Sequence, residues 1–161
     1  MSDWFYATSS EKQTLDLGVR LGRLLQQPAL ILLRGELGAG KSVLARGIAR
    51  GLGVAARTPI TSPTFTLMNH YPARLDLYHF DLYRLNDPDE LIEIGFDDFA
   101  YGAGIALVEW PERLGDETTP GLWISLQHAG NARRNITFQA KSSIAEVLLE
   151  ALKQQLTQSS N

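Results

Sequence analysis

The chain has 161 residues, of which 44% are hydrophobic and 20% charged, so one soluble globular domain without a separate large substrate domain is expected. Its formal net charge of −3 gives no overall positive field for DNA or RNA, and no apolar stretch approaches the roughly 20 residues that cross a bilayer. The lack of cysteine excludes disulfides, cysteine-based zinc sites and thiol nucleophiles but says little about the compartment. Because the N-terminus also lacks a secretory-signal pattern, a cytoplasmic location is expected.

The N-terminal segment predicts a short strand followed by an amphipathic helix. Residues 4–8, WFYAT, have the aromatic content of a strand. Ser10 and Gln13 form the pattern of a capping box, which marks the start of a helix. The leucines that follow recur on one helical face: Leu17, Leu21, Leu24 and Leu25.

A second strand and a second helix flank a glycine-rich loop. Residues 29–35, ALILLRG, have the continuous apolar character of a strand that is covered on both faces. A helix is expected from Lys41 to about Arg50, where Gly51 and Gly53 would end it. The loop between them, GELGAGKS, matches the phosphate-loop pattern G-x-x-x-x-G-K-[ST] at every fixed position.

The fixed residues of this loop are suited to holding a nucleotide. Glycines let backbone N–H groups point at phosphate oxygens, and the helix adds its positive N-terminal end. Lys41 would reach the β- and γ-phosphates, and the Ser42 hydroxyl would ligate Mg²⁺. The loop amides expected to face phosphate belong to Gly38, Ala39 and Gly40. The flanking strand and helix favour nucleotide binding over a chance glycine-rich turn, and the absence of an N-K-x-D segment favours ATP over GTP.

The connection after this helix, residues 54–65, is polar and leads into a run of hydroxyl side chains. These are Thr58, Thr61, Ser62, Thr64 and Thr66. In phosphate-loop hydrolases such a region often acts as a switch that reaches the metal and the γ-phosphate. Ser-Pro and Thr-Pro pairs also supply ordinary turn chemistry, so both interpretations stay open.

The remainder of the chain predicts further strands, short helical turns and a last helix. The strand-like stretches are 66–71, 75–83, 104–110, 122–128 and 134–140. The last two of them alternate like antiparallel edge strands. Residues 87–99 have the pattern of short helical turns. The fold class is therefore expected to be α/β, with parallel strands in the middle and antiparallel additions late.

The chain is expected to end in an amphipathic helix. This helix would start at Ser143, with Glu146 completing a capping box. Its expected buried stripe comprises Ile144, Val147, Leu148, Ala151 and Leu152. Residues 1–156 are assigned to a single domain, and residues 157–161 to a frayed C-terminal tail.

Two acidic residues are candidates for the second anchor that a bound Mg²⁺–triphosphate needs. Glu109 ends the hydrophobic strand IALVE, and Asp81 interrupts the apolar segment YHFDLYRL. One acid is expected to hold the metal and the other to orient or deprotonate water, and the residues alone do not assign the roles. His79 shares a strand face with Asp81, but a packed core histidine is favoured over a partner for it. Trp110 is expected to be a core aromatic that is sensitive to the site.

Four segments, taken together, are more specific than the phosphate loop alone. GELGAGKS, TSPTFTL, YHFDLYRL and ALVEWPERL resemble, in order and spacing, the TsaE (YjeE) family of small bacterial P-loop ATPases. The resemblance covers nearly the whole chain and implies a P-loop NTPase fold with a mixed sheet of about seven strands, flanked by helices. It also implies slow, Mg²⁺-dependent ATP hydrolysis to ADP in tRNA threonylcarbamoyladenosine biosynthesis. The implied partners are TsaB and TsaD, which modify the adenosine beside the anticodon, so tRNA would be contacted only indirectly.

The resemblance also implies roles for individual residues. Lys41 and the loop amides would hold phosphate, while Ser42 and Glu109 would bind Mg²⁺. Asp81 matches the family's essential aspartate near the γ-phosphate, so the expected catalytic residues are Asp81, Glu109 and Lys41. Ser42 stands where threonine is common in the family, and the retained hydroxyl is expected to preserve metal binding.

The resemblance further implies that the nucleotide base lies between two other segments. These are the start of the first helix, at Glu11 and Thr14, and the turn around Gly130. Two other functions are compatible with a phosphate loop: a P-loop small-molecule kinase and a nucleotide-binding scaffold without turnover. A kinase needs a lid with phosphate-clamping arginines, for which only Arg133 and Arg134 are available. The paired acids argue against the scaffold.

Overall fold

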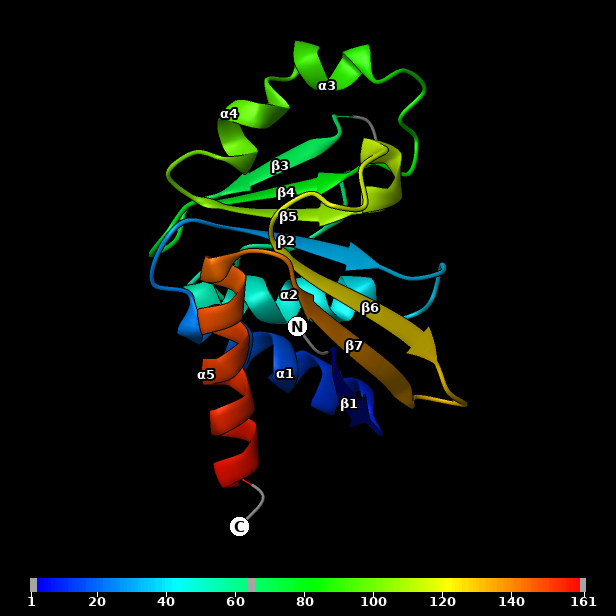
Figure 1. Cartoon of the computed structure of the whole chain (residues 1–161), viewed down its shortest axis with the longest axis vertical. Coiled ribbons are helices and arrows are strands. Elements are labelled where there is room, and N and C mark those ends of the chain that lie inside the picture. Colours follow the sequence, from blue (N-terminus) through cyan, green and yellow to red (C-terminus); the bar gives the residue numbers. More distant parts are fainter. Residues whose placement is uncertain (1–2, 64–65, 160–161) are drawn as a thin grey trace.

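The computed structural model describes residues 3–63 and 66–159, and within them seven strands form one mixed sheet (Figure 1). The strand order is β1-β7-β6-β2-β5-β4-β3. The strands are β1 (Trp4–Thr8), β2 (Ala29–Arg34), β3 (Met68–Tyr71), β4 (Leu77–Asp81), β5 (Ile105–Glu109), β6 (Leu122–His128) and β7 (Arg134–Ala140). β4, β5, β2 and β6 run parallel, and β1, β7 and β3 pair antiparallel. The expected mixed sheet with a parallel centre is confirmed.

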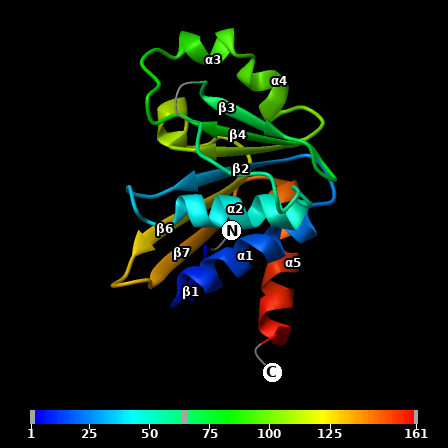
Figure 2. The same cartoon turned by 180° about the vertical axis from the view of Figure 1, so that it is seen from behind.

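Helices cover both faces of this sheet. They are α1 (Glu11–Leu24), α2 (Lys41–Leu52), α3 (Asp89–Glu93), α4 (Phe96–Ala100), the 3₁₀ helix η1 (Pro111–Leu114) and α5 (Ser143–Ser159). α1 and α2 lie behind the sheet in Figure 1 and in front of it in Figure 2. No helix within 3–63 and 66–159 combines the length and apolar character needed to cross a membrane.

Two hydrophobic cores result, one on each face of the sheet. The first joins the sheet to α1, α2 and α5, and the second joins it to α4, with residues of α3 and η1 at its margin. β2 contributes to both, because Ile31 and Leu33 enter the first core while Leu30 and Leu32 enter the second. Burial on both faces explains why this strand reads as a continuous apolar run.

Glycines bring α1 and α2 into close backbone contact. A Cβ on Gly47 or Gly51 of α2 would lie 2.3 or 2.2 Å from a carbonyl oxygen of α1. Gly18 and Gly22 of α1 face α2 in the same way, at 2.5 and 2.3 Å. The prediction that Gly51 ends the helix is therefore wrong: it lies inside α2, and Gly53, with φ of 101°, forms the C-cap.

The predicted positions of the two late strands need correction. They were expected at the sheet edge, but β6 lies between β2 and β7, and β7 lies between β6 and β1. β6 is parallel to β2 and antiparallel to β7, so it joins the parallel centre to the antiparallel part. The edges are β1 and β3.

The last helix is rotated relative to the predicted stripe. Its buried apolar residues are Ala145, Leu148, Leu149, Leu152 and Leu156. Ile144 and Val147 are 42% and 67% exposed, so their assignment to the core is wrong. The side-chain cap is also one residue earlier than expected, because the Ser142 hydroxyl accepts from the Ala145 N–H at 3.1 Å. The helix continues to Ser159, into the segment assigned to the tail.

Candidate functional site

The phosphate loop joins the carboxyl end of β2 to the start of α2, as the sequence predicts. Gly38 and Gly40 have φ of 80° and 103°, a left-handed conformation that side-chain-bearing residues rarely adopt. Gly40 is the N-cap of α2, and no side chain of the described residues caps this helix end. The N–H groups of the first turn therefore present positive dipole ends without a side-chain acceptor, which suits an anion.

Lys41 lies against the loop and an aromatic ring. Its Nζ donates to the Gly35 carbonyl at 2.5 Å and lies 3.6 Å from the centre of the Trp110 ring. The residue is 5% exposed. Burial lowers the pKa of Lys41, and the carboxylates of Glu109 and Glu112 partly oppose that effect. A phosphate at the loop would place a further negative charge near this ammonium group and would favour its charged form.

Asp81 and Glu109 end two neighbouring parallel strands. They are register partners across β4 and β5, and Leu33, just before the phosphate loop, is the partner of Glu109 on the other side. Asp81 accepts a hydrogen bond from the Tyr83 N–H at 3.0 Å. Its pKa is raised, mainly by burial and further by Glu109, against the lowering effects of the Tyr83 bond and of Lys41. The two predicted acids therefore lie side by side next to the loop.

Glu109 has a buried partner that the sequence did not assign. The Nε2 of His79 lies 2.6 Å from the Glu109 Oε2, with side-chain exposures of 2% and 4%. His79 and Asp81 share a strand face as expected, but the contact of the histidine is with Glu109 on β5. This hydrogen bond restricts the orientation of the glutamate carboxylate.

Trp110 links the site to the second core. Its backbone is left-handed, with φ of 58°, which is uncommon for a bulky residue and places it as the N-cap of η1. The ring packs on the second core, 4.9 Å from the Tyr83 ring, and contacts Lys41. Trp110 is thus both a packed aromatic and a wall of the site.

A cavity of about 270 Å³ lies beside the loop. It is lined by Glu11, Thr14, Gly40, Val43, Asn131, Ala132 and Arg134. The start of α1 and the turn after β6, both predicted near the base, are therefore brought together next to the loop. Gly130 belongs to this turn, with φ of 104°, but does not itself line the cavity. The Thr14 hydroxyl is shared with Thr8 at 2.7 Å, so it is already occupied.

Arg134 holds the loop in place and was missed as a site residue. Its Nε donates to the Ala39 carbonyl at 2.8 Å, and another guanidinium nitrogen donates to the Gly38 carbonyl at 3.1 Å. The same side chain also donates to Asn131, in the turn before β7. Arg134 therefore ties the loop to the sheet instead of belonging to a mobile lid, which removes one of the two arginines that a kinase lid would need.

The site offers oxygen ligands for Mg²⁺ in the way this ion prefers. Ser42 is exposed in the first turn of α2, and Glu109 ends the neighbouring strand. The described residues contain no group of three His, Asp or Glu side chains placed to hold a metal. Mg²⁺ commonly takes one or two protein oxygens and completes its shell with water and phosphate, so these donors fit an ion that arrives with a nucleotide.

The hydroxyl-rich segment after α2 is partly anchored. The Thr61 carbonyl accepts from the Asn69 side chain at 2.9 Å, and the Thr58 carbonyl accepts from Arg50 at 2.7 Å. Thr64 lies outside the described residues. A switch role for this segment stays a prediction.

The comparisons with known proteins agree with this geometry. A model of the family described as "Threonylcarbamoyl adenosine biosynthesis protein TsaE" matches residues 8–136, most of the chain. The chain belongs to the TsaE family. The tRNA threonylcarbamoyladenosine biosynthesis protein TsaE of Treponema pallidum (strain Nichols) is 40% identical over 129 residues, covering 80% of this chain and 94% of that protein. Its namesake from Bacillus subtilis (strain 168) is 40% identical over 126 residues, covering 76% and 77%.

A solved TsaE-like structure confirms the fold. The crystal structure of Bacillus subtilis YdiB matches with a TM-score of 0.77 and 32% identity, over 96% of each chain. The P-loop fold expected from the sequence is therefore confirmed. The TsaE family model also spans the phosphate loop, Asp81 and Glu109, so all three lie within the matched part of the chain.

Proposed function

We propose that this TsaE protein binds ATP with Mg²⁺ and hydrolyses it slowly, in support of threonylcarbamoyl transfer to tRNA by the TsaB–TsaD complex. The proposal is based mainly on one arrangement at the carboxyl ends of β2, β4 and β5. There the phosphate loop, the start of α2 without a side-chain cap, and Lys41 lie next to two acids that are register partners. A scaffold that only binds nucleotide needs the loop, but it does not need a second carboxylate beside the first.

The loop and Lys41 would bind the triphosphate. N–H groups at the start of α2 would donate to phosphate oxygens, and Lys41 would exchange its contact with the Gly35 carbonyl for the β- and γ-phosphates. Ser42 and Glu109 would hold Mg²⁺, which when bound neutralises charge on the phosphates. The His79 hydrogen bond keeps Glu109 oriented for that task.

Asp81 is assigned to the attacking water. It lies beside Glu109 but is only partly buried, and its raised pKa makes it a better proton acceptor than an ordinary aspartate. The hydrogen bond from the Tyr83 N–H fixes one carboxylate oxygen and leaves the other for water. With one carboxylate assigned to the metal and the other to water, this chain's own groups would supply both functions that ATP hydrolysis needs.

The partner assignment rests on the family and on charge. The chain has a net charge of −3, which gives no general positive field for tRNA. We therefore assign the reacting base to TsaD and TsaB, and the ATP-driven cycle to this protein. The cavity formed by Glu11, Thr14 and the turn that contains Gly130 is assigned to the base of ATP.

Reconstitution tests the proposal. TsaB, TsaD, tRNA and threonylcarbamoyl-adenylate are combined with this protein and ATP, and tRNA modification is followed over many turnovers. Sustained modification is expected only with the protein and hydrolysable ATP, and a non-hydrolysable analogue should allow a single round at most. Undiminished turnover without the protein would contradict the proposed function. Rapid phosphorylation of sugars or nucleosides without partners would favour a kinase instead.

A further inference from the structure

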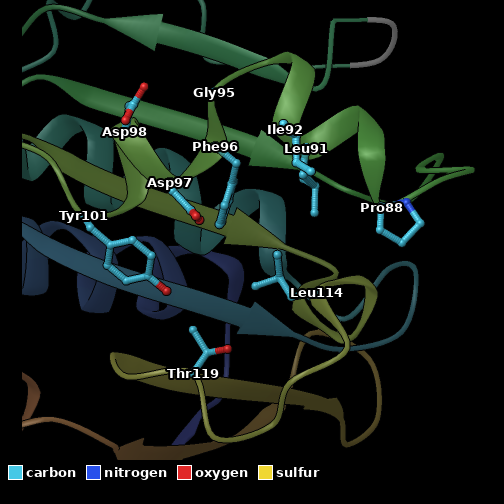
Figure 3. A pocket seen from close by; sticks show the side chains of 10 residues that line it. All are labelled: Pro88, Leu91, Ile92, Gly95, Phe96, Asp97, Asp98, Tyr101, Leu114 and Thr119. Atoms are coloured by element: carbon cyan, nitrogen blue, oxygen red, sulfur yellow. The ribbon is translucent and has the colours of Figure 1, made fainter.

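A second concave surface lies on the sheet face opposite α1 and α2. It is a groove of about 420 Å³ between α3, α4 and η1. Its apolar lining consists of Pro88, Leu91, Ile92, Phe96, Tyr101 and Leu114. In Figure 3, Leu91 on α3 and Phe96 on α4 point toward Leu114, and Tyr101 lies beside Asp97. No reactant of the proposed hydrolysis has a place in this groove.

The groove carries apolar side chains that are open to water. Ile92 is 79% exposed and Tyr101 is 59% exposed, and α3 has no buried residue at all. Clustered apolar exposure of this kind is uncommon on soluble proteins without a binding role. Helices of five residues are too short to be stable on their own, so α3 and α4 depend on packing for their order.

The rim of the groove is strongly acidic. Between Arg84 and Arg113 the chain has eight acidic residues and no lysine or arginine. Asp97 lines the groove itself, and Glu93 on α3 is exposed beside Ile92. Such a surface repels the phosphates of RNA and of anionic lipids, and it attracts lysine and arginine. The complementary partner is therefore a protein surface.

The groove is connected directly to the catalytic acids. Asp81 ends β4, and the chain after it leads into α3; Glu109 ends β5, and η1 follows through Trp110. Leu114 at the end of η1 lines the groove, while Trp110 at its start contacts Lys41. A ligand that contacts η1 therefore contacts the same element whose N-cap is Trp110, the residue next to Lys41 in the nucleotide site.

We propose that the groove between α3, α4 and η1 is the docking site for a basic protein segment that inserts an apolar side chain next to Ile92. The identity of the partner, the TsaB–TsaD complex, rests on the proposed function. Occupation of the groove positions η1, and through Trp110 it sets the position of Lys41 and the rate of ATP hydrolysis. Protein docking and the nucleotide site are coupled through one 3₁₀ helix.

Two substitutions in the groove and two matched controls test this. Ile92→Ser and Glu93→Lys alter the apolar and the charged part of the surface. Val147→Ser and Glu150→Lys make the same changes on the exposed face of α5, away from the groove. All four sites are exposed, so the variants are expected to fold and to bind ATP alone as the wild type does.

Affinity for purified TsaB–TsaD is measured by biolayer interferometry in the presence of ATP, at low and at high salt. We expect Ile92→Ser and Glu93→Lys each to weaken binding about tenfold or more and to reduce partner-stimulated ATP hydrolysis in parallel. Wild-type binding should weaken with salt, and Glu93→Lys should flatten that dependence. The α5 variants should match the wild type.

The outcomes separate this inference from the proposed function. Wild-type binding and tRNA modification, unchanged in both groove variants, would overturn the docking site and leave the proposed function intact. Failure of the wild type itself to bind TsaB–TsaD or to support modification would overturn both. Loss of self-association in the groove variants, measured by light scattering, would show that the occupant is a second copy of this chain and would also overturn the proposal.

Discussion

Lys41 makes contacts with the loop and with Trp110 that a bound nucleotide would have to replace. Its Nζ donates a hydrogen bond to the Gly35 carbonyl and lies over the Trp110 ring. Lys41→Met keeps an unbranched stem for packing but removes the charge. We expect ATP affinity to fall at least about tenfold, equivalent to about 1.4 kcal/mol, with little change in the unfolding midpoint. Calorimetric titration and thermal unfolding measure the two effects, and normal ATP turnover by the folded variant would contradict the assignment.

The lowered pKa of Lys41 predicts a pH dependence of ATP binding. Burial disfavours the charged lysine, so the neutral form gains population below the usual lysine pKa of about 10.4. Neutral lysine does not attract phosphate, and ATP affinity should therefore fall as pH rises from 7 toward 10. Because bound phosphate favours the ammonium form, binding in this window should take up protons. Titration calorimetry in buffers of different ionisation enthalpy detects that uptake, and Lys41→Met should lack it.

Substitutions of Asp81 and Glu109 are expected to affect different properties, the rate of hydrolysis and the Mg²⁺ requirement. Asp81→Asn should leave ATP affinity largely intact and reduce hydrolysis by about 10²-fold or more, because it loses the proton acceptor. Glu109→Gln should instead raise the Mg²⁺ concentration needed for binding and turnover, because it loses a metal ligand. Mg²⁺ titrations of both variants, following binding and phosphate release separately, measure the split. Equal Mg²⁺ requirements would contradict it.

The parts of the site that depend on local pattern were predictable, and those that depend on distant contacts were not. The loop, Lys41 and the strand-end acids follow from a motif and from the rule that parallel strands end at one edge. The hydrogen bond of His79 to Glu109 needs the register of β4 against β5. The hydrogen bond from Arg134 to the Ala39 carbonyl joins residues that are nearly a hundred positions apart in the sequence. A pair of arginines at the start of a strand does not indicate that contact in the sequence.

At the scale of the elements, the close contact of α1 with α2 depends on glycine. Gly51→Ala would place a Cβ 2.2 Å from the Val19 carbonyl oxygen, so the helices must separate. Alanine would otherwise favour a helix over glycine by up to about 1 kcal/mol. We expect a net destabilisation of about 1–3 kcal/mol, measured by denaturant unfolding. Lys12→Ala, at an exposed position of α1, is the control and should change stability by less than about 0.5 kcal/mol. A more stable Gly51→Ala protein would contradict the close packing.

The order of helices and strands was predictable, but their neighbours in space were less so. The strands were located by their apolar patterns. Burial on one face gives alternating apolar residues, and burial on both faces gives a continuous apolar run. The same alternation placed β6 at an edge, although it pairs on both sides. In α5, Leu148 and Leu152 were assigned correctly, while Ile144 and Val147 were not. Apolar residues surround much of this helix, and only its contacts with α1 and the sheet select the buried side.

At the scale of the whole molecule, charge is distributed unevenly. Eight of the 18 acidic residues lie between Arg84 and Arg113, where there is no basic residue. All 15 lysines and arginines therefore belong to the rest of the chain, which has only the remaining acids. The acidic segment contains Glu109, the proposed metal ligand, and most of the groove, and its carboxylates Glu109 and Glu112 interact electrostatically with Lys41 of the phosphate loop. The net charge of −3 thus conceals a division between an acidic surface and a more basic remainder.

This division predicts that the protein alone binds tRNA only weakly. The basic residues outside the acidic segment are spread over several elements, and the acidic surface repels phosphate, so weak attraction of an RNA backbone is expected. We expect the dissociation constant for unmodified tRNA at physiological salt to be no tighter than the non-specific range of about 10⁻⁴ to 10⁻⁶ M. Fluorescence anisotropy with labelled tRNA, with and without TsaB–TsaD, measures it. Retention of tRNA should require the partners, and the groove variant Glu93→Lys should lose that retention together with TsaB–TsaD binding. Nanomolar binding by this chain alone would contradict the indirect contact with tRNA, because a direct RNA surface would then have to exist on the basic remainder of the molecule.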